Sequence, residues 1–176
     1  PSTPAAPPPL LTEAFGLYQR GQHRLARMVA RAALLGHPER ADGWCLLGVA
    51  ERGLNDVPNA ERAYRRAVTV YPEYPDAWFN LGNALRFAKR FEESREAYAQ
   101  AIRLQPDHAL AHSLISDVHR ELLQLEEAEA AARKALAIRP DFAEAWGHLG
   151  NALNDLERFE EAAACYERAL QLPDCP

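Results

Sequence analysis

The residues best suited to chemistry in this sequence are three neighbouring histidines, His108, His112 and His119. Imidazoles spaced by turns of a helix are a common way to hold a transition metal. Here, however, His108 falls before an expected helix, and the other two occupy positions that pack against neighbouring helices. We therefore interpret all three as partly buried structural residues and expect no metal.

The cysteines do not offer a second kind of site. Cys45, Cys165 and Cys175 lie far apart or at the carboxyl end, and none belongs to the Cys-x-x-Cys spacing of zinc and redox motifs. The sequence also lacks a glycine-rich phosphate loop and a nucleophile elbow. These features predict a chain with no catalysis of its own and no cofactor. Reduced thiols indicate a cytoplasmic location.

Composition and charge narrow the range of partners. The chain has 176 residues and a formal net charge of -5, which disfavours nucleic acid because phosphate binding needs a concentrated basic surface. No apolar run approaches the roughly 20 residues that span a bilayer, so we expect no membrane insertion. Residues 1–74 are slightly basic and residues 75–176 are acidic. A cationic partner would therefore be attracted to the later part of the chain.

The elements that would position a site recur every 34 residues. Trp44, Trp78 and Trp146 are in phase with this period, and His112 stands at the place of the missing tryptophan. Small residues, alanines and prolines form further columns: Gly48, Gly82, Ser116 and Gly150; Ala33, Ala67, Ala101, Ala135 and Ala169; Pro38, Pro72, Pro106 and Pro140. A fixed period of this length is typical of stacked helical repeats.

The segment 75–108 explains why these residue types return. Trp78, Leu81, Gly82 and Leu85 recur at i, i+3, i+4 and i+7 and so share one face of a first helix. A polar break at Lys89-Arg90 is followed by a second helix, which starts with two glutamates and ends before Pro106. One such pair cannot bury its apolar stripe alone, so successive pairs must stack.

This segment resembles the tetratricopeptide repeat, whose pattern is Trp-x-x-Leu-Gly-x-x-Tyr and then Ala, an aromatic residue, Ala and Pro. The residues that carry the resemblance are Trp78, Leu81, Gly82, Leu85, Ser94, Tyr98, Ala101 and Pro106. The resemblance implies an all-α fold, a right-handed α-solenoid of about five antiparallel helix pairs. The expected repeats form one solenoid domain after a Pro-rich disordered lead-in at 1–6: a degenerate repeat at 7–40, then 41–74, 75–108, 109–142 and an irregular last repeat at 143–176.

Repeats of this family bind a protein or peptide in their concave groove, and we expect the same of this chain. The groove positions of the later repeats hold Phe79, Asn80, Asn83, Arg86, Phe87, Ser113, Asp117, Arg120, His148, Asn151 and Asn154. Asparagine has both a donor and an acceptor, so a ladder of asparagines could hold an extended peptide backbone. The alternative interpretation is that these are ordinary solvated polar residues.

Two further hypotheses remain beside the binding scaffold. The string Phe79-Asn80-Leu81-Gly82-Asn83 resembles the asparagine-lined repeats of the O-linked N-acetylglucosamine transferases and of bacterial arrays. That resemblance implies the amino-terminal substrate-recognition module of a larger enzyme, a glycosyltransferase or sulfotransferase, and a start without Met suits a fragment. Alternatively, apolar faces at the terminal repeats would produce a self-assembling homo-oligomer.

Two patterns are assigned to structure rather than to a site. The three tryptophans fall on the packing face, which favours a core role over a ligand-stacking box. Arg20, Arg24, Arg27 and Arg31 form a stripe on the expected second helix of the first repeat. We interpret this stripe as a solvated face, with contact to an acidic partner or to lipid as the alternative.

Overall fold

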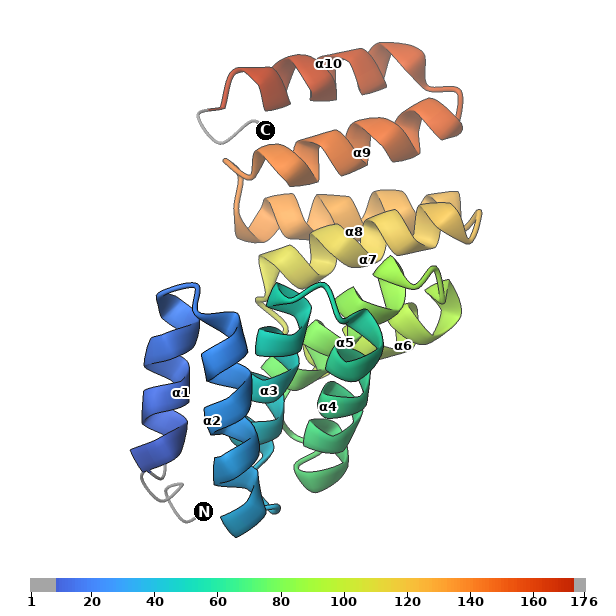
Figure 1. Ribbon diagram of the computed structural model, residues 1–176. Coiled ribbons are helices and arrows are strands. Elements are labelled where there is room, and N and C mark those ends of the chain that lie inside the picture. The colour runs from blue at the N-terminus through green and yellow to red at the C-terminus, as the bar shows by residue number, and fades with distance from the viewer. Residues whose placement is uncertain (1–8, 173–176) are drawn as a thin grey trace. The chain divides into compact units, whose positions relative to one another are not determined.

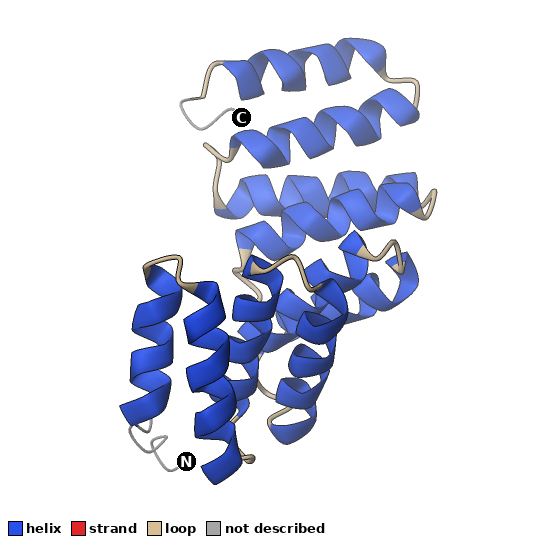
Figure 2. Ribbon diagram, in the orientation of Figure 1, coloured by secondary structure: helices blue, strands red, loops and turns tan. Residues whose placement is uncertain are grey.

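The computed structural model describes residues 9–172, and these residues form ten helices and no strand (Figures 1 and 2). In chain order the helices are α1 (Pro9–Gln19), α2 (His23–Gly36), α3 (Ala41–Gly53), α4 (Val57–Val70), α5 (Pro75–Phe87), α6 (Phe91–Leu104), α7 (Ala109–Glu121), α8 (Leu125–Ile138), α9 (Ala143–Asp155) and α10 (Phe159–Leu170). The predicted fold class, an all-α solenoid of about five helix pairs, is confirmed. The expected lead-in at 1–6 lies outside the described residues.

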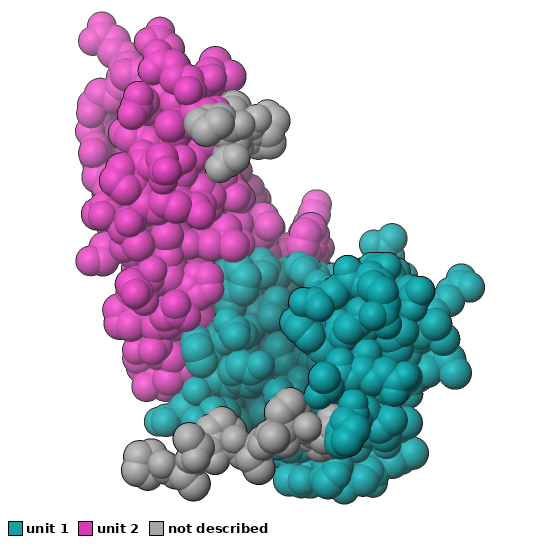
Figure 3. Space-filling view, turned by 90° about the vertical axis from the view of Figure 1, so that its left-hand side faces the viewer, with its two compact units in different colours: residues 1–84 teal, residues 85–176 magenta. Residues whose placement is uncertain are grey.

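The chain divides into two compact units, residues 1–84 and residues 85–176, with the boundary inside α5 (Figure 3). In the first unit α1 packs on α2, α2 on α3, and α3 on α4. In the second unit the same nearest-neighbour order runs from α6 to α10. Within each unit these helices therefore bury their apolar stripes against the helices next to them in sequence, as a repeat array requires.

A left-handed residue closes the turn inside every helix pair. Positive φ angles occur at Gly21 (71°), Asn55 (60°), Lys89 (58°), Leu123 (59°) and Glu157 (62°), which are 34 residues apart. The residue after each one donates a backbone hydrogen bond five residues back, as in the bond from Arg90 N to Leu85 O at 2.9 Å. This is the Schellman type of helix ending, in which glycine normally supplies the positive φ. Only the first turn has a glycine.

The glycines in the repeat mark places where a first helix lies against an aromatic ring of the second. A Cβ added to Gly48 would lie 2.4 Å from Tyr64 Cε1, and one added to Gly150 would lie 2.6 Å from Tyr166 Cε1. Atoms cannot approach so closely, so any larger residue at these two positions would have to displace the tyrosine ring. The alanines in phase with them are buried, and Ala67, Ala101 and Ala135 are fully covered.

Each tryptophan links its repeat to the preceding repeat through a hydrogen bond. Its indole Nε1 donates to the carbonyl of the proline six residues earlier, at 2.9 Å for Trp44, 2.7 Å for Trp78 and 2.9 Å for Trp146. His112 repeats the contact, since its Nε2 lies 3.0 Å from the Pro106 carbonyl oxygen. The histidine therefore replaces tryptophan in function as well as in position.

Candidate functional site: a polar face on α7 and α9

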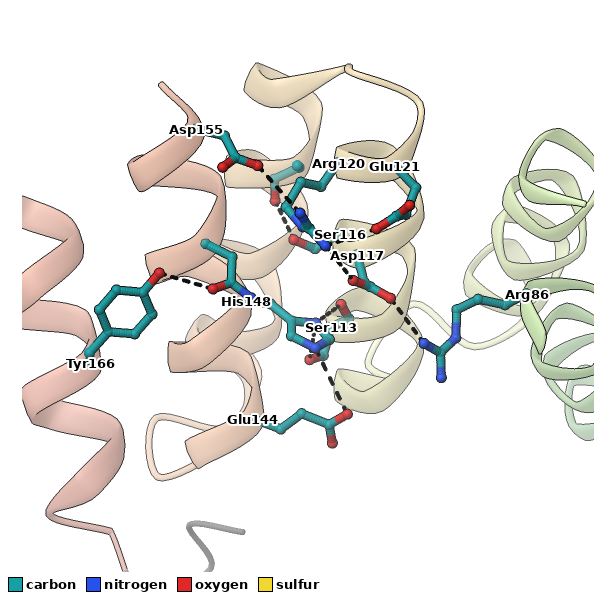
Figure 4. A network of polar contacts seen from close by, with 12 residues as sticks. Arg86, Ser113, Ser116, Asp117, Arg120, Glu121, Glu144, His148, Asp155 and Tyr166 are labelled. Carbon is teal, nitrogen blue, oxygen red and sulfur yellow. Dashed lines mark hydrogen bonds and ion pairs between the residues drawn. The ribbon is translucent and has the colours of Figure 1, made fainter. Parts of the chain in front are cut away.

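The first helices of the second unit carry a network of charged and polar side chains, shown in Figure 4. Asp117, on α7, lies near its centre. Arg86 Nη1, from the end of α5, is 2.9 Å from Asp117 Oδ2, and Arg120 Nη2 is 3.5 Å from Asp117 Oδ1. These side chains are only partly exposed, so their ion pairs are stronger than pairs in open solvent.

Arg120 extends the network to the next repeat. Its guanidinium lies 3.4 Å from Asp155 Oδ2 and 2.9 Å from Glu121 Oε1. Asp155 and Glu121 are exposed at the edge of the network. Among the charged side chains labelled in Figure 4 there are two guanidinium groups and four carboxylates, which are those of Asp117, Glu121, Glu144 and Asp155. The network therefore has an excess of negative charge.

His148 connects α9 to α7. Its Nδ1 donates to the Ser113 carbonyl oxygen at 2.7 Å and lies 3.4 Å from the Ser113 hydroxyl. On the other side of the ring, Nε2 is 4.0 Å from Glu144 Oε1. Ser113 is fully buried. The imidazole is thus held in place by Ser113 and Glu144. Ser113 contacts the ring but is itself buried and does not reach the surface.

Asn151 and Asn154 provide the amides of this face. Tyr166, on α10, donates its hydroxyl hydrogen to Asn151 Oδ1 at 2.9 Å. Since that bond occupies the amide oxygen and fixes the side chain, the Asn151 amide nitrogen is available as a donor. Asn154 is exposed one turn further along α9. Phe87 is 63% exposed, and the Arg86 guanidinium carbon lies 5.3 Å from its ring centroid.

We use the name polar face for these residues: Arg86, Asp117, Arg120, Glu121, Glu144, His148, Asn151, Asn154 and Asp155. The structure links most of the predicted groove residues of the second unit through the contacts above. Tyr166 was missed in the sequence analysis, although it shares its repeat position with Tyr64 and Tyr98. Its role depends on the hydrogen bond to Asn151, which the sequence pattern alone does not predict.

The three predicted groove residues of the first unit have a different environment. Phe79 and Asn80 are half-buried, and Asn83 is only 6% exposed. Asn80 Nδ2 lies 3.7 Å from Cys45 Sγ. Burial raises the pKa of the Cys45 thiol to about 11, so the thiol is unreactive at neutral pH. The asparagines of the predicted ladder therefore differ in solvent exposure, because Asn83 is buried and Asn154 is exposed.

The three histidines considered as metal ligands bind three different protein groups. His108 Nδ1 accepts from Ala111 N at 3.2 Å and caps α7. His112 binds the Pro106 carbonyl, and His119 Nδ1 lies 2.8 Å from Gln124 Oε1. Within residues 9–172 no group of three or more His, Cys, Asp or Glu side chains is arranged to hold a metal ion.

The expected arginine stripe is only partly a solvated face. Arg20 lies in the turn after α1 and not on α2. Arg31 Nη2 is 2.6 Å from Glu51 Oε1, and Arg27 Nη1 is 3.5 Å from Glu51 Oε2. Glu51, on α3, is 1% exposed. Arg31 is exposed, as predicted, and Arg27 is half-buried, but both also bind a buried carboxylate on the neighbouring helix, which the sequence did not predict.

Among the helices that the structure describes, none combines the length and the apolar character that a bilayer-spanning segment requires. Burial raises the pKa of Tyr98 to about 12.

The family of the chain follows from the repeats. The family profile for the tetratricopeptide repeat matches residues 11–68, 45–109 and 84–141, and a second profile of the same description matches residues 143–172. The chain therefore belongs to the tetratricopeptide repeat family. No curated protein sequence matches it.

Solved structures of this family share the fold. MamA 41-end from Desulfovibrio magneticus RS-1 superposes with a TM-score of 0.86 at 18% identity, over 95% of this chain and 97% of that chain. PilF of Pseudomonas aeruginosa gives 0.82 at 21% identity, over 92% and 74%. YrrB, described as a TPR protein with an unusual peptide-binding site, gives 0.82 at 17% identity, over 96% and 87%. At these identities the likeness establishes the fold alone.

Proposed function

We propose that this chain is a non-catalytic scaffold that binds a basic, extended segment of a partner protein on the polar face. The observation that carries the proposal is the chain of contacts from Arg86 through Asp117 and Arg120 to Asp155. Arg86 and Arg120 are equivalent positions of successive repeats, and each binds a carboxylate of the following repeat, which gives one continuous surface. Such a surface suits an extended peptide, which has its own regular spacing along the backbone.

The charge of the polar face supports a basic partner. Asp117 is satisfied by two arginines, whereas Glu121 and Asp155 share only Arg120 and are exposed. Carboxylates at the edge of a site attract lysine and arginine side chains and raise the rate of association. The edge of the polar face is therefore the place where basic side chains of a partner would bind.

The amides supply the part of recognition that does not depend on partner sequence. The Asn151 amide nitrogen is a donor held in position by Tyr166, and Asn154 offers both a donor and an acceptor. Peptide backbones present matching carbonyl and N–H groups. The related fold of YrrB, which has a peptide-binding site, supports this mode of use.

A charge-matched pair of variants tests the proposal. An array of unstructured peptides of varied charge identifies the strongest binder, which is then titrated by calorimetry. Glu121→Gln combined with Asp155→Asn removes two carboxylates from the polar face. Glu160→Gln combined with Glu167→Gln removes two exposed carboxylates from α10 and is the control. We expect a Lys-rich or Arg-rich binder, and about tenfold weaker binding to the first variant only.

Other outcomes would reject the proposal. If the two double variants weaken binding equally, the effect comes from net charge and not from the polar face. If the strongest binders are acidic, the assigned partner chemistry is wrong. Asn151→Ala and Asn154→Ala together should also weaken binding of the selected peptide, whatever its side chains.

Self-assembly is a second proposal with an observation in its favour. Large apolar side chains are exposed on the first and last described helices: Leu10 and Phe15 on α1, and Phe159 and Leu170 on α10. Pairing of such faces between copies would produce a homo-oligomer. Light scattering over a concentration series tests this idea, and a monomer at every concentration contradicts it. The role of the chain as a module of a larger enzyme stays a prediction.

A further inference from the structure

Helix α2 carries an apolar stripe on its outer side as well as on its inner side. The inner stripe is buried and consists of Ala26, Ala30, Ala33 and Leu34. The outer stripe is exposed and consists of Leu25, Met28, Ala32 and Leu35, with exposed fractions of 48% for Leu25, 62% for Met28 and 89% for Leu35. Its spacings of three, four and three residues are those by which one helix packs lengthwise on another.

The outer stripe borders a cavity in the first unit. This cavity has a volume of about 690 Å³ and lies among residues of α2, α3 and α4. Its lining includes Met28 and Leu35 of α2, Trp44 and Leu47 of α3, and Ala63 of α4. Helix α3 packs against both α2 and α4, so the three helices that line the cavity form one packed group. Large side chains of a docked helix would fit into this space.

The charge around the cavity is basic. Helix α2 contains three arginines and no acidic residue, and α4 contains three arginines and one glutamate. Arg31 and Arg62 line the cavity itself. Glu51 also lines it, but this carboxylate already binds Arg31 and Arg27. The corresponding helices α6, α8 and α10 each carry three acidic residues and at most two basic ones.

We propose that the outer stripe of α2 and the adjoining cavity form a docking site for an amphipathic helix of a partner protein, with large aliphatic residues at heptad spacing and acidic residues beside them. The aliphatic residues would pack on Met28 and Leu35. The acidic residues would pair with Arg24 and Arg62, because Arg31 already binds Glu51. A second copy of α2 does not fit, because it would place arginine against arginine. The site lies in the first unit and shares no residue with the polar face.

A designed peptide provides the probe. It contains three heptads with Leu at the first and fourth positions and Glu at the flanking positions, and its counterpart has Lys in place of Glu. Charge repulsion keeps the free peptide largely unfolded, so helix formation on binding is visible by circular dichroism. Fluorescence anisotropy gives the affinity. We expect the Glu peptide to bind and become helical, and the Lys peptide to bind at least about tenfold more weakly.

Variants locate the binding on α2. Leu35→Asp should weaken binding of the Glu peptide about tenfold or more, because a charge then lies in the apolar contact. Leu123→Asp makes the same change at another exposed leucine and is the control. Leu123 lies in the turn between α7 and α8 and is 84% exposed. Arg24→Glu, also at an exposed position, should weaken the Glu peptide and improve the Lys peptide. This exchange of charge preference cannot result from unfolding.

Three results would overturn the inference. Equal binding of the two peptides would remove the charge argument. Equal effects of Leu35→Asp and Leu123→Asp would move the binding away from α2. Self-association of the chain that Leu35→Asp abolishes would show that a second copy, and not a partner helix, occupies the stripe. Sedimentation of the chain alone measures this last case.

Discussion

Arg31 donates a hydrogen bond from Nη2 to Oε1 of Glu51 over 2.6 Å, and the carboxylate that accepts it is 1% exposed. The two residues belong to different helices, α2 and α3, and stand 20 residues apart. Arg27 approaches the second carboxylate oxygen. The first and second helix pairs are therefore joined by a buried anion held between two arginines.

Removing the arginines should destabilise the chain more than removing the glutamate. Arg27→Ala with Arg31→Ala leaves a buried carboxylate without a cation, which costs about 3 kcal/mol of unfolding free energy. Glu51→Met removes the buried charge and keeps the volume, and both arginines can then turn to solvent. We expect the unfolding free energy of Glu51→Met to lie within about 1 kcal/mol of that of the wild type. Urea unfolding followed by circular dichroism measures both, and the opposite order would contradict the explanation.

The indole hydrogen bond and the indole volume can be separated at Trp146. Trp146→Phe keeps most of the ring but loses the bond to the Pro140 carbonyl, and should cost about 1 kcal/mol. Trp146→Ala also removes the ring from the interface and should cost about 3 kcal/mol. Equal losses in thermal and urea unfolding would show that the hydrogen bond contributes almost everything.

His112 should make the stability depend on pH. Burial lowers the pKa of His112 from its ordinary value of 6.5, although its bond to Pro106 opposes this. The unfolded chain therefore takes up a proton first as the pH falls. Stability that is fully present above about pH 6.5 is lost as the pH falls through the lowered pKa.

A tryptophan at the same place is the control for that prediction. His112→Trp restores the residue found in the other repeats, can donate to the same carbonyl, and does not titrate. We expect the wild type to lose more stability than this variant between pH 7 and pH 5, in urea unfolding at each pH. Parallel losses in the two proteins would assign the pH dependence to other groups.

The left-handed turns predict a stabilising substitution. Leu123 has a φ of 59° and is 84% exposed, so its side chain strains the backbone and packs on little. Leu123→Gly should raise the unfolding free energy by about 1 kcal/mol. Gly21→Ala, at the equivalent turn with a φ of 71°, should lower it by a similar amount. No change in either variant would mean that these turns are not strained.

The sequence by itself determined the helices and their pairing. Tryptophan, small residues, alanine and proline return every 34 residues because each repeat must meet the same steric demands at the same places. The turn at Lys89 and the close contact at Gly150 follow from that local pattern. A pattern with this period leaves few other folds open, since each apolar stripe must be covered by the next helix.

Only the tertiary structure decided which polar side chains meet. The pairs Arg31–Glu51, Arg86–Asp117 and Tyr166–Asn151 join residues of different helices. Long charged and polar side chains can reach several partners, and the choice depends on the angle and distance between packed helices. That geometry is set by the whole interface and not by any single repeat. For this reason the buried role of Glu51 was not visible in the sequence.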